Sequence, residues 1–335
     1  MIKLAQIGMG QWGQNLLRTY LSLSDCQMKI CCDEDQKTLE KFSRLYHNKF
    51  GVTQHFDDIL NDPEIQGVII ATPAITHANL AMRALCANKH VFVEKPLALS
   101  VNDGMRMIEL AHQNNRLLMV GHLLLYHPAV QKLKNAVDTG QLGDIHYLYS
   151  TRVNLGTIRE EENALWSLTV HDISVAMHLL NQAPLEVTAT GSAYLRKDVH
   201  DVVFVTLYFK NNVMSHIHAS WLDPHKIRKF TVVGSKKMAV FDDMESSEKL
   251  KFYDKGVERM QHSGGYETFL TLREGDIHIP HVHMMEPLKL ECQHFIDSIA
   301  YKKPVLSDGH NGLNVLKVLT AAQESLMTHG KPIRI

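Results

Sequence analysis

Short apolar runs alternate with amphipathic stretches through the first 121 residues. The runs lack polar alternation, which is typical of strands buried on both faces. Two clear helical stretches are 75–88 and 101–114, and the second begins with the capping pattern Ser100-x-x-Asp103. Repeated strand–helix units predict an α/β fold with a parallel, doubly wound Rossmann sheet. The apolar runs are 4–7, 28–32, 68–71, 91–93 and 117–120.

The pattern changes after Gly121, where strand-like segments follow one another with few helices between them. This order predicts a C-terminal α+β domain with a large, open, mostly antiparallel sheet. We therefore divide the chain into a Rossmann domain over 1–121 and a substrate-binding and oligomerisation domain over 122–335. The expected strands are 145–155, 185–195, 201–209, 213–221, 227–233 and 237–242, and the expected helices are 128–138, 169–181, 287–301 and 311–328.

The segment 201–209 is apolar on both faces. One face carries Val203, Val205, Leu207 and Phe209, and the other carries Val202, Phe204 and Tyr208. A sheet covered by helices on one side only would expose one of these faces, and an exposed apolar face of that size usually marks an interface. We expect a homodimer or homotetramer that forms through the open sheet.

Composition narrows the class of protein. The chain has 335 residues with a formal net charge of −1, so its charge favours neither nucleic acid nor an anionic membrane. No apolar run is long enough to span a bilayer, and no leader-like segment begins the chain. The five cysteines show no Cys-x-x-Cys spacing, which argues against a disulfide framework and fits a cytoplasmic protein.

Histidine is abundant, with 21 residues, and His216 and His218 are two positions apart on an expected strand. They would share one face of that strand. No cysteine or carboxylate completes a ligand set beside them, so we interpret the pair as part of a half-polar sheet face and expect no metal site.

A glycine motif follows the first strand and begins the first helix. Its six residues are Gly8, Met9, Gly10, Gln11, Trp12 and Gly13. The first glycine allows a tight turn, the second lets a pyrophosphate approach, and the third lets helix and strand pack closely. The helix N-terminus favours an anion. Asp33 lies about 20 residues further on, where a carboxylate binds the ribose of NAD and repels the 2′-phosphate of NADP.

Two more segments follow strands of the expected parallel sheet, at the edge where such sheets bind ligands. One contains Thr72, Pro73 and His77, and the other is Glu94-Lys95-Pro96. With the glycine motif they resemble the Gfo/Idh/MocA oxidoreductase family over nearly the whole chain. The resemblance implies an NAD cofactor that these segments help to bind, with Lys95 beside the nicotinamide and the reacting hydroxyl.

The resemblance is sharper to a branch of that family found in sugar-nucleotide and polysaccharide biosynthesis. It implies a dehydrogenase of a UDP-N-acetylhexosamine or a related nucleotide sugar, often acting at C3. The segments that carry it are 10–15, 121–122, 126–128, 142–145, 152–156, 165–166, 171–172, 220–226 and 286–288.

Two side chains are candidates for the chemistry. Lys95 can donate to the reacting oxygen and stabilise negative charge that develops there. His171 can accept or relay the proton near neutral pH. The family usually has an aspartate four residues before this histidine, where the present chain has Ser167. Asp172 would point away from His171 on a helix, so it is not a simple replacement.

Further side chains are candidates for substrate contact. Arginine suits a diphosphate or carboxylate through paired donors, and an aromatic ring can stack on a sugar or a nicotinamide. For each of them singly, a packing or surface role remains an equal alternative. The candidates are Tyr126, Arg152, Asn154, Arg159 and Trp166, with Trp166 also a candidate for cofactor contact.

Three functions remain open from the sequence. The first is hydride transfer between NAD and a nucleotide-linked sugar, as a dehydrogenase or ketoreductase. The second is oxidation of a free polyol or sugar, as inositol and glucose dehydrogenases of the same family perform it. The third is a catalytically weak protein that holds NAD as a structural ligand. Ser167 gives the third some support, while Lys95 and His171 argue against it.

Overall fold

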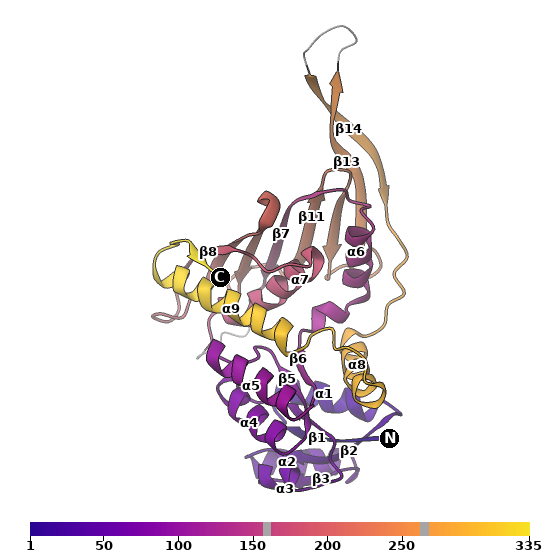
Figure 1. Cartoon of the computed structure of the whole chain (residues 1–335), viewed down its shortest axis with the longest axis vertical. Helices are drawn as coiled ribbons and strands as arrows, with labels where there is room; N and C mark the ends of the chain where they lie inside the picture. Colours follow the sequence, from indigo (N-terminus) through magenta and orange to yellow (C-terminus); the bar gives the residue numbers. More distant parts are fainter. Residues whose placement is uncertain (157–161, 262–267) are drawn as a thin grey trace. The chain divides into compact units, whose positions relative to one another are not determined.

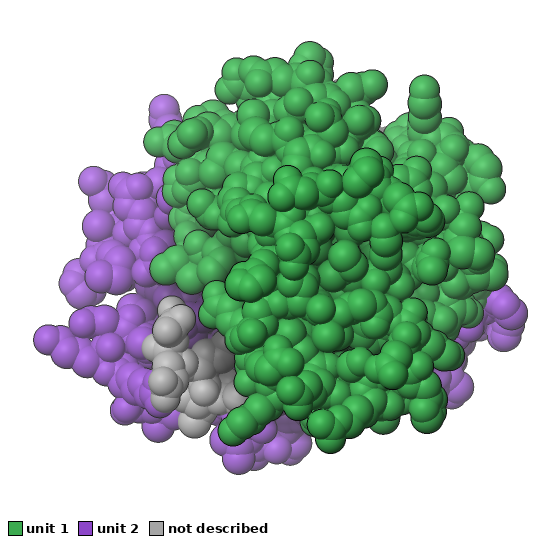
Figure 2. Space-filling model, turned by 90° about the horizontal axis from the view of Figure 1, so that it is seen from below, with its two compact units in different colours: residues 1–126, 285–317 green, residues 127–284, 318–335 purple. Residues whose placement is uncertain are grey.

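The computed structural model describes residues 1–156, 162–261 and 268–335. The chain forms two compact units, shown in different colours in Figure 2. The first comprises Met1–Tyr126 and Met285–Lys317, and the second comprises His127–Met284 and Val318–Ile335. The sequence-based division after residue 121 did not predict that 285–317 group with the N-terminal unit.

The first unit is built on a parallel sheet with the strand order β3-β2-β1-β4-β5-β6, six strands within its described residues. This is the predicted doubly wound Rossmann arrangement (Figure 1). Its strands are β1 (Ile2–Ile7), β2 (Cys26–Cys32), β3 (Gly51–Thr53), β4 (Gly67–Ile70), β5 (His90–Glu94) and β6 (Leu118–Gly121). Its helices are α1 (Gln11–Leu21), α2 (Gln36–Leu45), α3 (Phe56–Leu60), α4 (Ala74–Cys86), α5 (Val101–Gln113) and α8 (Pro287–Tyr301), with the first part of α9 (Gly309–Met327).

Burial explains why the inner strands are uniformly apolar. Val68, Ile69 and Ile70 of β4 have no exposed surface, as expected for a strand covered on both faces. The capping pattern is also present, because Ser100 Oγ accepts a hydrogen bond from the Asp103 amide at 3.3 Å at the start of α5. Because the paired strands of this sheet all run parallel, their carboxyl ends lie at one edge of it.

The second unit has a mixed sheet with the order β14-β13-β12-β11-β7-β10-β9-β8-β15, nine strands over the part of the chain that the structure describes. All neighbours are antiparallel except β7 and β10, so the prediction of a mostly antiparallel sheet is confirmed. The strands are β7 (Ile145–Val153), β8 (Glu186–Ser192), β9 (Val202–Tyr208), β10 (Met214–Ser220), β11 (Ile227–Gly234), β12 (Met238–Asp242), β13 (Leu250–Gln261), β14 (Thr268–His278) and β15 (Ile333–Arg334).

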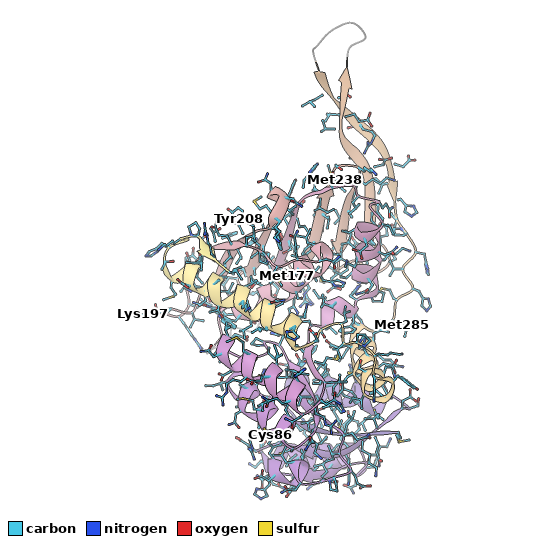
Figure 3. The ribbon with its side chains drawn as sticks, viewed as in Figure 1. Cys86, Met177, Lys197, Tyr208, Met238 and Met285 are labelled. Carbon is cyan, nitrogen blue, oxygen red and sulfur yellow. The ribbon has the colours of Figure 1, made fainter. Side chains whose placement is uncertain are left out.

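The two faces of this sheet differ. The helices α6 (Pro128–Asp138) and α7 (Val170–Leu180) and the later part of α9 lie against one face (Figure 1). On β9, the inner side chains Val203, Val205 and Leu207 are completely buried. The outer face carries large apolar side chains that are 39–42% exposed, and Figure 3 labels one of them, Tyr208. They are Tyr147, Tyr149, Phe204, Tyr208 and Met214.

The long hairpin of β13 and β14 was not predicted from the sequence. Its two strands pair over much of their length, with Val257 opposite Leu272. Both of these side chains are more than half exposed, so this stretch has no buried face. The sequence therefore carries no alternation of apolar and polar residues by which such a ribbon could be recognised.

Along 1–156, 162–261 and 268–335, every helix is too short or too polar to cross a bilayer.

Candidate functional site

The turn between β1 and α1 is shaped by close backbone contacts. Gly8 has φ +92°, and a Cβ there would lie 2.4 Å from the carbonyl oxygen of Ala71. A Cβ on Gly13 would lie 2.2 Å from the carbonyl oxygen of Gly8. Gly10 caps α1, and a Cβ there would meet nothing within 4 Å. The loop thus leaves open space in front of a helix N-terminus, which fits the pyrophosphate of a dinucleotide.

Gln6 locks this turn from inside the first strand. Its fully buried side chain donates through Nε2 to the carbonyl oxygens of Gly8 (2.9 Å) and Gly13 (2.8 Å). The sequence analysis did not identify Gln6. A lone polar residue within the apolar run 4–7 is the signal by which it could have been found.

Asp33 lies next to the glycine turn at the end of β2. Its Oδ2 accepts from the Met9 amide at 2.6 Å, and its Oδ1 accepts from the Asp35 amide at 3.0 Å. These bonds fix a half-buried carboxylate beside the turn. Because this is where a dinucleotide-binding fold presents an acid to the ribose, Asp33 fits NAD.

The segment after β4 is tied to the segment after β5. His77, in the first turns of α4, is almost fully buried. Its Nδ1 lies 2.8 Å from the carbonyl oxygen of Pro96, and its Nε2 lies 2.9 Å from that of Thr72. Thr72 also shares a hydrogen bond with the Thr76 hydroxyl, and Pro73 caps α4. The His77 ring therefore links the loop after β4 to the loop after β5 through their backbone carbonyl groups.

Glu94 ends β5 and is linked to the glycine motif. Its Oε1 accepts from Trp12 Nε1 at 2.5 Å, and its Oε2 accepts from the Lys95 amide at 3.2 Å. Burial raises the pKa of the Glu94 carboxyl to about 7, although the Trp12 bond and the Lys95 charge oppose the change. The structure thus brings the glycine motif, Asp33, Thr72, Glu94 and Lys95 together along the carboxyl ends of neighbouring strands.

A second buried carboxyl lies near Glu94. Glu291, on α8, has no exposed surface, and neither of its carboxyl oxygens has a hydrogen-bond partner among the described residues. Burial, and secondarily the charge of Glu94, raises the pKa of Glu291 well above the ordinary range of a carboxyl. His122 is buried at the end of β6, and burial together with the Lys95 charge lowers its pKa to about 3. His122 is therefore neutral beside the charge of Lys95.

In the second unit, an ion pair holds the start of α7. Arg152, near the end of β7, donates through Nε to Asp172 Oδ2 at 2.6 Å and through an Nη to Asp172 Oδ1 at 3.3 Å. Both side chains are buried. Asp172 follows His171 directly, so this pair fixes the helical turn that carries the histidine. The predicted contact of Arg152 with substrate stays a prediction, and its observed partner is Asp172.

Ser167 lies in a π-helical turn, Leu165–Thr169, that leads into α7. Side chains four residues apart share a face on a regular α-helix, but the wider π-helical turn changes this spacing between Ser167 and His171. Trp166 lies in the same turn, and its indole Nε1 donates to Gln323 Oε1 at 3.1 Å.

The remaining candidates are placed separately. Tyr126 is buried in the first unit, where its hydroxyl lies 3.0 Å from Ser307 Oγ and its ring packs edge-on against His294. Asn154 follows β7, and its backbone N–H donates to the backbone carbonyl of Ser220 at 3.1 Å. Arg159 lies outside the described residues. Across the described ranges, no group of three or more His, Cys, Asp or Glu side chains is arranged to hold a metal ion.

The buried carboxyl of Glu291 makes stability depend on pH. A carboxyl whose folded-state pKa is raised stabilises the fold below its ordinary pKa, and this contribution is lost as pH rises through the folded-state value. We expect Glu291→Gln to change the melting temperature little at about pH 5 and to raise it by about 3 °C or more at about pH 8, roughly 1 kcal/mol. Thermal denaturation across pH measures this.

Glu286→Gln is the matched control, because it removes the same charge from an exposed position at the start of α8. A Glu291→Gln profile parallel to that of the native protein would show that Glu291 is not protonated in the fold.

Comparisons with known proteins agree with this geometry. A family model described as "Oxidoreductase family, NAD-binding Rossmann fold" matches residues 2–122, and the model of the Gfo/Idh/MocA C-terminal domain matches residues 130–240. Myo-inositol 2-dehydrogenase of Thermotoga maritima is 25% identical, over 97% of this chain and 96% of its own. UDP-N-acetylglucosamine 3-dehydrogenase of Acidithiobacillus ferrooxidans is 25% identical, over 92% of each chain.

A crystal form of the Acidithiobacillus ferrooxidans enzyme superposes with a TM-score of 0.84, covering 98% of both chains at 22% identity. The likeness to that structure shows the fold. The family models together cover more than half of the chain, and the first unit is an NAD-binding Rossmann domain. The chain therefore belongs to the Gfo/Idh/MocA oxidoreductase family.

Proposed function

We propose that this protein transfers hydride between NAD and a sugar carbon, C3 of a nucleotide-linked sugar being the leading choice. The observation that carries the proposal is the chain of contacts from the glycine turn to Lys95. It runs from Trp12 of the turn to Glu94, and from Glu94 to the Lys95 amide, while the Met9–Asp33 bond fixes a carboxylate beside the same turn. A half-buried lysine at the end of this chain is suited to a reacting hydroxyl or keto oxygen. The nucleotide-sugar substrate is supported by the similarity to UDP-N-acetylglucosamine 3-dehydrogenase.

The two chemical roles follow from the side chains. Lys95 stabilises negative charge on the sugar oxygen. His122 is neutral and supplies no positive charge for this purpose. His171 holds or moves the proton of the hydroxyl, and the Arg152–Asp172 pair fixes its turn of α7. The nicotinamide supplies the hydride acceptor or donor when NAD is bound.

Oxidation of a free polyol is the second candidate. It is favoured by the similarity to myo-inositol 2-dehydrogenase, which spans 97% of the chain against 92% for the nucleotide-sugar enzyme, at the same 25% identity. Tests with UDP-N-acetylglucosamine and with myo-inositol, each with NAD, separate the two. The compound that raises the melting temperature and yields NADH identifies the substrate class. Binding of NAD with no NADH from any sugar or polyol in a wider panel would favour a catalytically weak protein.

Asp33 gives a prediction on cofactor preference. We expect the protein to prefer NAD over NADP, because the fixed carboxylate would face the 2′-phosphate. Asp33→Ser should narrow the ratio of the two dissociation constants by about tenfold or more. Titration of both cofactors measures it, with Asp25→Ser, before β2, as the control. Tighter binding of NADP to the native protein would refute the preference.

Lys95 gives a prediction on turnover. Lys95→Ala should lower kcat by about a hundredfold or more, as the loss of a preorganised charge-stabilising donor does, and leave NAD binding largely unchanged. Lys317→Ala, at an exposed position on α9, is the matched control. Near-native turnover in Lys95→Ala would remove this side chain from the reacting oxygen.

The open face of the large sheet gives a prediction on assembly. We propose that it forms a dimer or tetramer interface, since aromatic rings stand exposed on β7 and β9, which flank β10, and Phe204 stacks on His218 of β10. The variant carrying both Tyr149→Glu and Phe204→Glu should sediment as a monomer, while Leu45→Glu on α2 should not change the assembly. A native protein that is monomeric at micromolar concentration would contradict the proposal.

A further inference from the structure

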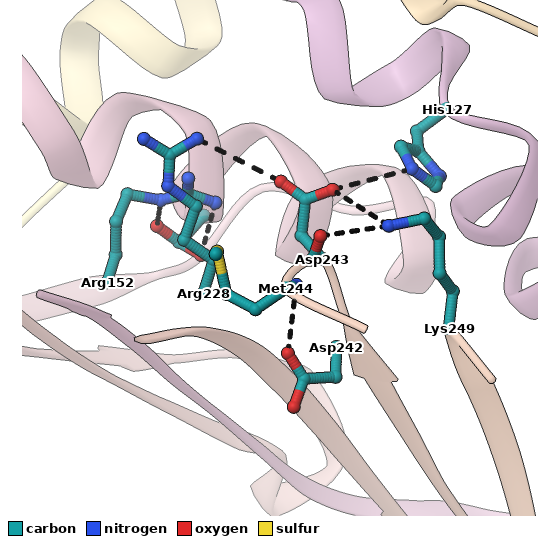
Figure 4. Close-up of polar contacts among 8 residues, drawn as sticks. His127, Arg152, Arg228, Asp242, Asp243, Met244 and Lys249 are labelled. Carbon is teal, nitrogen blue, oxygen red and sulfur yellow. Dashed lines mark hydrogen bonds and ion pairs between the residues drawn. The ribbon is translucent and has the colours of Figure 1, made fainter. Parts of the chain in front are cut away.

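Charged side chains gather at one end of the large sheet. Arg152 near the end of β7 pairs directly with Arg228 at the start of β11 in the strand register, so the two side chains lie on the same face. Asp243 follows β12 and accepts ion-pair contacts from its neighbours (Figure 4). The two arginines therefore lie beside each other, where like charges repel unless each has an anion.

Arg152 has its anion. Two of its nitrogens donate to the two carboxyl oxygens of Asp172, and both side chains are buried. This bidentate pair engages both carboxyl oxygens of Asp172, so Arg152 has a direct and buried counter-charge.

Arg228 does not have a comparable partner. Its Nη1 lies 4.0 Å from Asp243 Oδ2, and no acceptor within the described ranges is at hydrogen-bonding distance from its guanidinium. Asp243 is shared, because its Oδ1 also lies 3.6 Å from His127 Nε2 and 3.9 Å from Lys249 Nζ. With Arg152, Arg228 and Lys249 against two aspartates, the cluster has one cation in excess.

The surroundings of Arg228 disfavour its charge. Burial and the neighbouring Arg152 lower the pKa of its guanidinium, with the two aspartates opposing the change. An arginine stays protonated in this situation, so the excess charge persists and an anion would relieve it. The Arg228 side chain is 39% exposed, which leaves part of its guanidinium group accessible to a ligand.

We propose that Arg228 is the anchor for an anionic group of the substrate, a phosphate or a carboxylate, which its fork binds through paired hydrogen bonds. The assignment rests on the proposed function and deepens it, because it requires a charged substrate and disfavours a neutral polyol. Arg152 acts in this arrangement as a positioning residue. It occupies Asp172 and thereby leaves Arg228 as the cation that a ligand can reach.

The experiment compares Arg228→Gln with Lys229→Gln in the NAD-saturated protein. Lys229 is the next residue, is exposed, and lies 3.0 Å from Asp242, so its variant removes the same charge from the other face of β11. Equilibrium titrations use UDP as the phosphate probe, glucuronate as the carboxylate probe and myo-inositol as the neutral probe. We expect Arg228→Gln to weaken binding of one anionic probe by about tenfold or more, and Lys229→Gln to leave it within about twofold.

The probe that loses affinity identifies the group that Arg228 binds. Arg228→Lys should recover part of the affinity, because lysine keeps the positive charge but lacks the paired donors of the guanidinium group. Unchanged binding of both anions in Arg228→Gln would overturn the assignment, and so would an equal loss for myo-inositol. If no nucleotide sugar is turned over but the arginine-dependent binding of an anion remains, the proposed reaction fails and the anion site stands.

Discussion

The approach of α1 to β1 is the contact on which the first unit depends. There is no room for a Cβ between Gly13 and the Gly8 carbonyl, and the Gln6 amide bridges the same two residues. This closeness fixes the start of α1 relative to the strand ends. It also leaves the Met9 amide facing Asp33 and the Trp12 indole facing Glu94. A larger residue at either glycine would therefore disturb the cofactor site at several points at once.

Electrostatics distinguishes the two units. The first buries two carboxyls, Glu94 and Glu291, in an interior that favours their neutral forms. The second gathers arginines on one face of its sheet and neutralises them incompletely. Neither arrangement is expected from stability alone, because an uncompensated buried charge is costly. Such features are more common where a ligand or a reaction uses them.

The sequence predicted the elements whose periodicity comes from a buried face. The parallel sheet, the helices 128–138 and 287–301 and the strands from β7 to β12 are all of this kind. The β13–β14 hairpin was missed because much of it has no buried face, and the grouping of Met285–Lys317 with the first unit is a long-range packing property. The glycine motif was readable because each of its glycines has a local steric reason. Gln6 was overlooked although it is a lone polar residue in an apolar run, whereas the role of Glu291 depends on burial that no local pattern reveals.

The arginines show why a residue type is a weaker guide than its partners. From the sequence, Arg152 was a candidate for substrate contact, and Arg228 belonged to an ordinary strand. In the structure, Arg152 donates to both carboxyl oxygens of the buried Asp172. Arg228, by contrast, lies 4.0 Å from a carboxyl oxygen of Asp243. A guanidinium whose donors are filled within the protein contributes to shape, and one whose donors are not filled can select a ligand. The question of a charged or neutral substrate is therefore tied to one side chain, Arg228, which is not part of the segments that carried the resemblance in the sequence.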